Sequence, residues 1–129
     1  MKRIALLTFT AAIIVFGCRK SINIIVSQPP DSPPVMRLEP MKAPLADRYV
    51  EITALEVDRV FDGRKPPLEP VWVIVTKDEK PVRVTEITYG VVPPEFKEIR
   101  PAQALVPGAE YNIRAGKAGN TGGARFTKQ

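Results

Sequence analysis

From residue 49 onward, apolar and polar positions form short runs of strand length, separated by turn residues. Residues 71–76 are a continuous apolar run rich in β-branched side chains, which is typical of a strand covered on both faces. Residues 111–115 alternate between apolar and polar positions, which predicts a strand with one buried face. The Gly- and Asn-rich residues 119–123 then predict a hairpin connection to a last strand over residues 124–128.

Two further runs change phase part-way along. Residues 49–57 place apolar side chains first on one face and then on the other, and residues 82–89 do the same near Glu86. Such a change predicts a bulge or a bend. Residues 91–104 carry three prolines and predict a loop with brief extended pieces. Because no long stretch after the N-terminal region has a helical period, we predict an all-β fold, a small antiparallel β-sandwich over residues 48–129.

The N-terminal residues have a different pattern. Lys2 and Arg3 precede an apolar run over residues 4–17, and Cys18 follows it. A basic start, a short apolar stretch and a small residue before a cleavage point are typical of an export signal. The run is shorter than the roughly 20 residues that a membrane-spanning helix needs. We therefore expect residues 1–17 to be a signal peptide that is removed.

The end of this signal resembles the lipobox of bacterial lipoproteins. Val15, Gly17 and Cys18 match that motif, and Phe16 departs from it because a smaller residue is usual there. The resemblance implies that Cys18 is acylated and becomes the first residue of the mature chain. Since Arg19 rather than aspartate follows, it also implies the outer membrane, facing the periplasm. An ordinary signal peptide and an uncleaved anchor remain alternatives.

The composition narrows the chemistry that we expect. Cys18 is the single cysteine and the chain has no histidine, so neither disulfides nor a usual zinc site are expected. Without residues 1–17 the chain has 17 basic and 14 acidic side chains, a net charge of +3, scattered along its length. We expect no metal, no cofactor, no catalytic residue, no small-molecule substrate and no nucleic-acid partner.

Residues 18–47 contain six prolines and predict an extended tether between the lipid anchor and the β domain. The apolar residues Ile22, Ile24 and Val26 interrupt it. They predict either a strand paired with the main domain or a segment that waits for a strand of a partner. Residues 35–38 are a weaker strand candidate of the same kind.

The stretch Leu105-Val106-Pro107-Gly108-Ala109-Glu110-Tyr111 is similar to the entry to a late strand of fibronectin type III and related immunoglobulin-like domains. The resemblance implies that the Tyr111 hydroxyl bonds to an upstream backbone group and that Trp72 is a core residue. Residues 87–90 look like a middle strand of that fold. Only fourteen residues separate Gly90 from Leu105, so either strands are missing or the domain is another small β fold.

A few side chains remain as candidates for binding chemistry. Trp72, Tyr89 and Phe96 could stack on a sugar if they were exposed, although core positions are the simpler interpretation. Glu95 and Glu98 flank Phe96 in a proline-bounded segment and could form the rim of a ligand site.

The sequence therefore predicts a lipid-anchored, non-enzymatic envelope protein whose β domain binds or stabilises an envelope protein assembly. The alternatives are a carbohydrate- or peptidoglycan-binding module, and an inhibitor or exclusion lipoprotein displayed at the surface.

Overall fold

The computed structural model describes residues 20–40, 49–61, 69–118 and 120–129 of the chain. The expected signal peptide and Cys18 lie outside these residues. The described part contains no helix that is long and apolar enough to cross a membrane. Its secondary structure is entirely β, which confirms the predicted all-β class. The strands are β1 (Lys20–Ser27), β2 (Val35–Pro40), β3 (Val50–Ile52), β4 (Ala54–Val60), β5 (Glu69–Thr76), β6 (Val82–Val84), β7 (Glu86–Thr88), β8 (Phe96–Arg100), β9 (Glu110–Lys117) and β10 (Asn120–Thr127).

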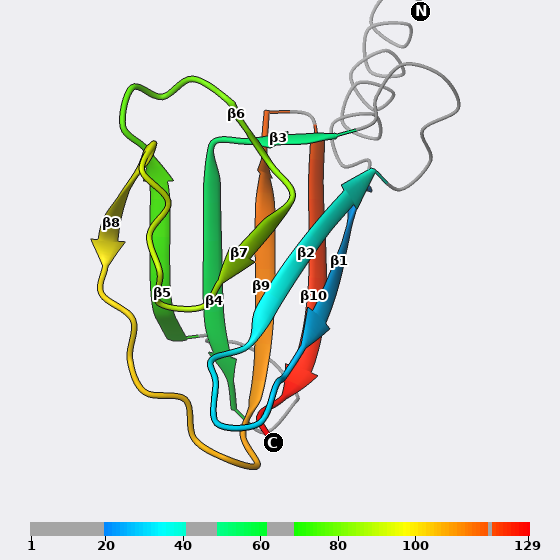
Figure 1. Ribbon diagram of the computed structural model, residues 1–129, viewed down its shortest axis with the longest axis vertical. Coiled ribbons are helices and arrows are strands. Elements are labelled where there is room, and N and C mark those ends of the chain that lie inside the picture. Colours follow the sequence, from blue (N-terminus) through cyan, green and yellow to red (C-terminus); the bar gives the residue numbers. More distant parts are fainter. Residues whose placement is uncertain (1–19, 41–48, 62–68, 119) are drawn as a thin grey trace, which may run out of the picture.

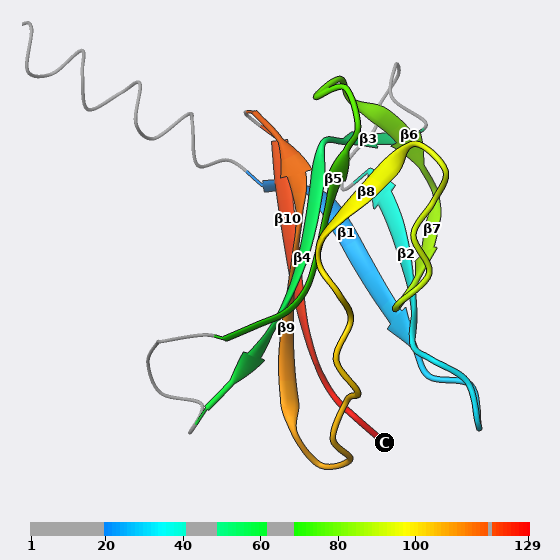
Figure 2. The same cartoon turned by 90° about the vertical axis from the view of Figure 1, so that its left-hand side faces the viewer.

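Eight of these strands form one large curled sheet in the order β7-β2-β1-β10-β9-β4-β5-β8, and β3 pairs with β6 in a separate small sheet. Figure 2 shows β10, β9, β4 and β5 as one wall and β2 and β7 as the wall that faces it. Strand β1 crosses from β10 to β2 and so joins the two walls. Strands β3 and β6 lie across the end of the domain that is uppermost in Figure 1.

The space between the two walls holds the apolar core. Trp72 on β5, Leu55 on β4 and Ile113 on β9 are fully buried on one wall, and Met36 on β2 and Ile87 on β7 are buried on the other. Each such side chain contributes about 2 kcal/mol when it is removed from water. The apolar positions in the alternating pattern of residues 111–115 are therefore the inward-facing positions of β9.

The first and last strands of the described chain form a parallel pair. Ile22 on β1 lies opposite Gly122 on β10. A Cβ atom on Gly122 would collide with the carbonyl group of Ile22, so this position requires glycine. The close approach lets β1 leave the first wall and pair with β2, and it closes the curl of the sheet.

The structure corrects the prediction of an extended tether. Residues 20–27 and 35–40 are not extended linkers, because β1 pairs antiparallel with β2 along its length and β2 also pairs with β7. The prolines between residues 29 and 34 lie in the turn between β1 and β2, and Pro40 ends β2. Alternate apolar side chains of this segment are buried in the core, namely Ile22, Ile24, Met36 and Leu38, and that burial outweighs the extended preference of the prolines. Residues 18–19 and 41–47 of the expected tether lie outside the described residues.

The other sequence predictions have mixed outcomes. The phase changes are confirmed, because residues 50–60 form two strands that separate at Thr53, and residues 82–88 form two that separate at Thr85. Residues 91–104 contain loop and one brief extended piece, the strand β8, as predicted. The last hairpin connection is shorter than predicted, because β10 already begins at Asn120.

Candidate functional site: the free edge of β8 and the outer face of β4, β9 and β10

Strand β8 is the last strand at one end of the curled sheet. It pairs antiparallel with β5, and no strand of the described chain pairs with its other edge. The register shifts between Val73 and Ile74 of β5, which makes Ile99 an extra residue on β8, a β-bulge. The Ile99 side chain is 58% exposed. An apolar side chain on an unpaired strand edge is a feature that can receive a strand of another chain.

Charged side chains flank Ile99 on this edge. Lys97 and Arg100 are exposed. Edge charges and a bulge limit uncontrolled pairing with identical strands, and they leave room for pairing with a strand of complementary charge. The sequence did not locate β8 within residues 91–104, because four of its five residues are exposed and the burial pattern does not alternate.

Glu98 on the same strand has a structural role. The indole N–H of Trp72 donates a hydrogen bond of 2.8 Å to Glu98 Oε2, and the Phe96 side chain is buried. Glu98 therefore caps the edge of the core rather than forming a ligand rim with Glu95. Neither the depression on the outer face of β4, β9 and β10 nor a second one, lined by Pro34, Tyr89 and Leu105, includes Glu95 or Glu98.

The three aromatic side chains that a sugar-binding module would use are all in the core. Trp72, Tyr89 and Phe96 are 0%, 7% and 2% exposed. The rings of Trp72 and Tyr89 meet edge to face, with centroids 5.1 Å apart. The Tyr89 hydroxyl donates to the carbonyl of Gln103 at 2.6 Å, and burial raises the pKa of Tyr89 to about 12. These residues cannot form a stacking platform for carbohydrate.

The segment proposed as a partner strand is internal. Ile22 and Ile24 are buried in the core, and Val26 packs against it. Strand β1 has β2 on one side and β10 on the other. Of the two alternatives that the sequence left open, pairing with the main domain is the observed one, and a segment waiting for a partner is wrong for these residues.

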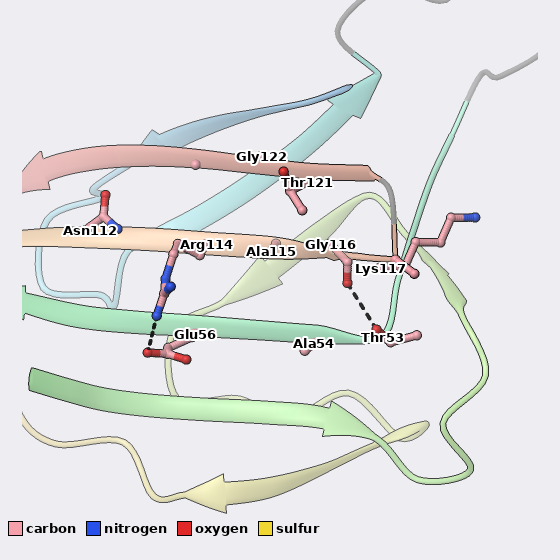
Figure 3. Close-up of a pocket in the computed structure, with 12 residues that line it drawn as sticks. Thr53, Ala54, Glu56, Asn112, Arg114, Ala115, Gly116, Lys117, Thr121 and Gly122 are labelled. Atoms are coloured by element: carbon pink, nitrogen blue, oxygen red, sulfur yellow. Dashed lines mark hydrogen bonds and ion pairs between the residues drawn. The ribbon is translucent and has the colours of Figure 1, made fainter. Parts of the chain in front are cut away.

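The outer face of β4, β9 and β10 has a shallow open depression of about 760 Å³ (Figure 3). Its floor is low because Ala54, Gly116 and Thr121, which lie opposite one another on the three strands, have small side chains. Such a floor allows close approach of another polypeptide. At one end, Lys117 Nζ lies 3.1 Å from Glu51 Oε1, and the Thr53 hydroxyl donates to the carbonyl of Gly116 at 3.2 Å.

Arg114 dominates the other end of the depression. Its Nη2 donates to Glu56 Oε2 at 2.7 Å and lies 3.3 Å from Asp58 Oδ2 (Figure 3 draws the first contact). Glu56 and Asp58 are two residues apart on β4, so their side chains point to the same face of the sheet. Strand β9 pairs with this part of β4. The two-residue spacing of Glu56 and Asp58 is visible in the sequence. Only the register of β4 against β9 brings these two side chains together with Arg114.

The pKa values of the two carboxyl groups in this cluster are shifted in opposite directions. The Asp58 side chain is fully buried, and neither of its oxygens accepts a hydrogen bond. Burial, followed by the neighbouring Glu56 carboxyl, raises the pKa of Asp58 to about 7. The adjacent Asp58 carboxyl holds the pKa of Glu56 below its ordinary value, and Arg114 adds to that effect. Asp58 is therefore the carboxyl group that takes up a proton first as the pH falls below neutral.

The tyrosine role that the sequence predicted is confirmed. The Tyr111 hydroxyl accepts a hydrogen bond of 2.9 Å from the backbone N–H of Val106, five residues upstream, and the side chain is buried. This bond fixes the turn at Gly108, whose φ of 87° lies in the left-handed region, and so sets the start of β9.

Comparison of this chain with protein-family models, curated proteins and solved structures gave no match. Within the described residues there is also no group of three or more Cys, Asp or Glu side chains that could hold a metal ion.

Proposed function

We propose that this protein is a lipid-anchored component of the bacterial cell envelope, held at Cys18, whose β domain binds another envelope protein through the free edge of β8. The proposed role is binding without catalysis, and the proposed location is the outer membrane, facing the periplasm. The observation that carries the binding mode is the pairing of β8 on one side only, with Ile99 exposed on it.

The sequence of the N-terminal region supports the anchor. Two basic residues, fourteen apolar or small residues and Cys18 follow the order of a lipoprotein signal. Cys18 is the single cysteine of the chain, so it has no disulfide partner. A thioether-linked lipid is the use that this position favours, and two or more acyl chains make such attachment stable.

The edge of β8 supports the binding mode. A strand from a partner would hydrogen-bond to the free backbone groups of β8, and its side chains would meet Ile99 on the exposed surface. Lys97 and Arg100 lie on either side of this position, and the carboxylate of Glu98 between them is bonded to Trp72. A partner strand with acidic side chains would therefore complement this edge. Strand addition in this geometry would extend the eight-stranded sheet by one strand.

A pull-down from detergent-solubilised envelopes tests this proposal. Tagged full-length protein is compared with the variants Ile99→Glu, on the β8 edge, and Val106→Glu, at an exposed apolar position in the loop before β9. We expect a stoichiometric partner with the wild type and with Val106→Glu, and its loss with Ile99→Glu. Absence of a stoichiometric partner, or equal capture by both variants, would contradict the proposal.

A further inference from the structure

The end of the domain at which β1 begins carries an exposed aromatic and cationic pair. Tyr49, just before β3, is 37% exposed, and the guanidinium carbon of Arg83 on β6 lies 3.7 Å from the centre of its ring. Strands β3 and β6 pair with each other and lie across this end of the sheet (Figure 1). Tyrosine and arginine are side chains typical of the zone between lipid headgroups and water.

A similar pair lies at the other end of strand β4. The guanidinium of Arg59 lies 5.1 Å from the ring centre of Phe61, which is 42% exposed. The presence of an aromatic and cationic pair therefore does not by itself decide which end of the domain meets a membrane.

The position at which β1 starts decides which end of the domain meets the membrane. Lys20 pairs with Thr121, close to the connection between β9 and β10. Cys18 precedes Lys20 by two residues, and two residues of chain span at most about 7 Å. A lipid on Cys18 would therefore hold the end with Tyr49 and Arg83 at the bilayer surface. The eight residues of β1 place its other end about 26 Å farther along the strand.

Arg83 is one of the cations at this end that are available for a phosphate group, and it lies beside the exposed tyrosine ring. Lys117 is paired with Glu51, and the turn over residues 77–80 has two lysines balanced by two acidic residues. Among the described residues, Arg83 forms no ion pair with a carboxylate. A guanidinium stacked on a ring still presents its N–H groups at its edge, where they can bind phosphate.

We infer that the end of the domain with Tyr49 and Arg83 lies on the headgroups of an anionic phospholipid surface. The inference rests on the lipid anchor proposed above. In this arrangement the domain lies directly on the membrane instead of being held away from it by a long tether. The turn between β1 and β2 faces away from the membrane.

Fluorescence quenching in vesicles tests the orientation. Acylation consumes Cys18, so one introduced cysteine can be labelled selectively. Ala118→Cys lies near the start of β1, and Ser32→Cys lies in the turn at the far end; both positions are exposed. The lipidated full-length variants are placed in phosphatidylethanolamine and phosphatidylglycerol vesicles that contain a headgroup quencher. We expect at least twofold stronger quenching at position 118, and equal quenching at the two positions would overturn the inference.

A second comparison tests the role of Arg83. Arg83→Ala is added to the labelled Ala118→Cys protein, with Arg59→Ala as the matched control from the other end. We expect Arg83→Ala to reduce the quenching at position 118 by about half and Arg59→Ala to leave it unchanged. No effect of Arg83→Ala would overturn the headgroup contact. If the wild-type chain carries no lipid, the anchor itself fails, and mass spectrometry of the purified protein separates that result from a wrong orientation.

Discussion

The hydroxyl oxygen of Tyr111 accepts a hydrogen bond from the backbone N–H of Val106 at 2.9 Å, and this bond joins the loop after β8 to the first residues of β9. Tyr111→Phe removes the acceptor and leaves the ring in place. We expect a loss of about 1 kcal/mol in the free energy of unfolding, measured by urea denaturation. Tyr49→Phe is the control, because Tyr49 is part-exposed. Equal effects of the two variants would show that the Tyr111 bond has no special weight.

Gly122 is the position at which β10 meets β1. A methyl group there would collide with the backbone of Ile22, so Gly122→Ala must push the two strands apart. We expect a loss of about 3 kcal/mol in stability, at the upper end of the usual cost of overpacking. At Gly123 the nearest atom to an added Cβ is the Ile113 carbonyl oxygen, 3.2 Å away. Gly123→Ala should therefore cost clearly less, and a reversed order would contradict the parallel pairing of β1 with β10.

Asp58 should make the stability of the domain depend on pH. Its pKa is raised to about 7 in the folded protein, from an ordinary value of 3.8. Between these two values the folded state holds a proton that the unfolded state releases, so stability is greatest at the acidic end of this window and falls as the pH rises towards 7. The lowered pKa of Glu56 acts in the opposite direction, at more acidic pH.

The variant Asp58→Asn tests this dependence. We expect urea denaturation between pH 5 and pH 8 to show a flatter profile for Asp58→Asn than for the wild type. Glu95→Gln, at an exposed carboxylate, is the control and should keep the wild-type slope. An unchanged slope in Asp58→Asn would show that Asp58 does not titrate in this range.

Glu98 links the edge strand β8 to the core through the indole of Trp72. Glu98→Ala leaves the indole N–H without its acceptor, and we expect a loss of about 2 kcal/mol, as for other hydrogen bonds to charged groups. Glu98→Gln keeps an acceptor and should lose less. The shift of the thermal unfolding midpoint and the tryptophan fluorescence report the two effects. If Glu98→Ala and Glu98→Gln behave alike, the hydrogen bond does not contribute.

Local patterns predicted those parts of the fold that depend on one segment alone. The run at residues 71–76, the alternation at residues 111–115 and the bond of Tyr111 each arise within a short stretch of chain. The role of Ile22 was left open, because its partner Gly122 is far away in the sequence and the parallel pairing of the two strands has no local signal. The prolines after β1 suggested a tether, whereas they occupy a turn between two paired strands.

The candidate site was harder to predict for the same reason. Glu56 and Arg114 belong to separate strands, and only the strand register brings them together. Ile99 lies in a strand that is mostly exposed, so its sequence has the pattern of a loop. The free edge of β8 is defined by the strand that pairs with it on one side and by the absence of a described strand on the other, and a single sequence does not contain this pairing.

Membrane fractionation of a Cys18→Ser variant tests the lipid anchor itself, because Cys18 is the proposed point of attachment. We expect the wild-type protein to be found with the outer membrane and Cys18→Ser, which cannot form the thioether, to be lost from it. A Cys18→Ser protein that stays membrane-bound at the wild-type level would contradict the lipid anchor.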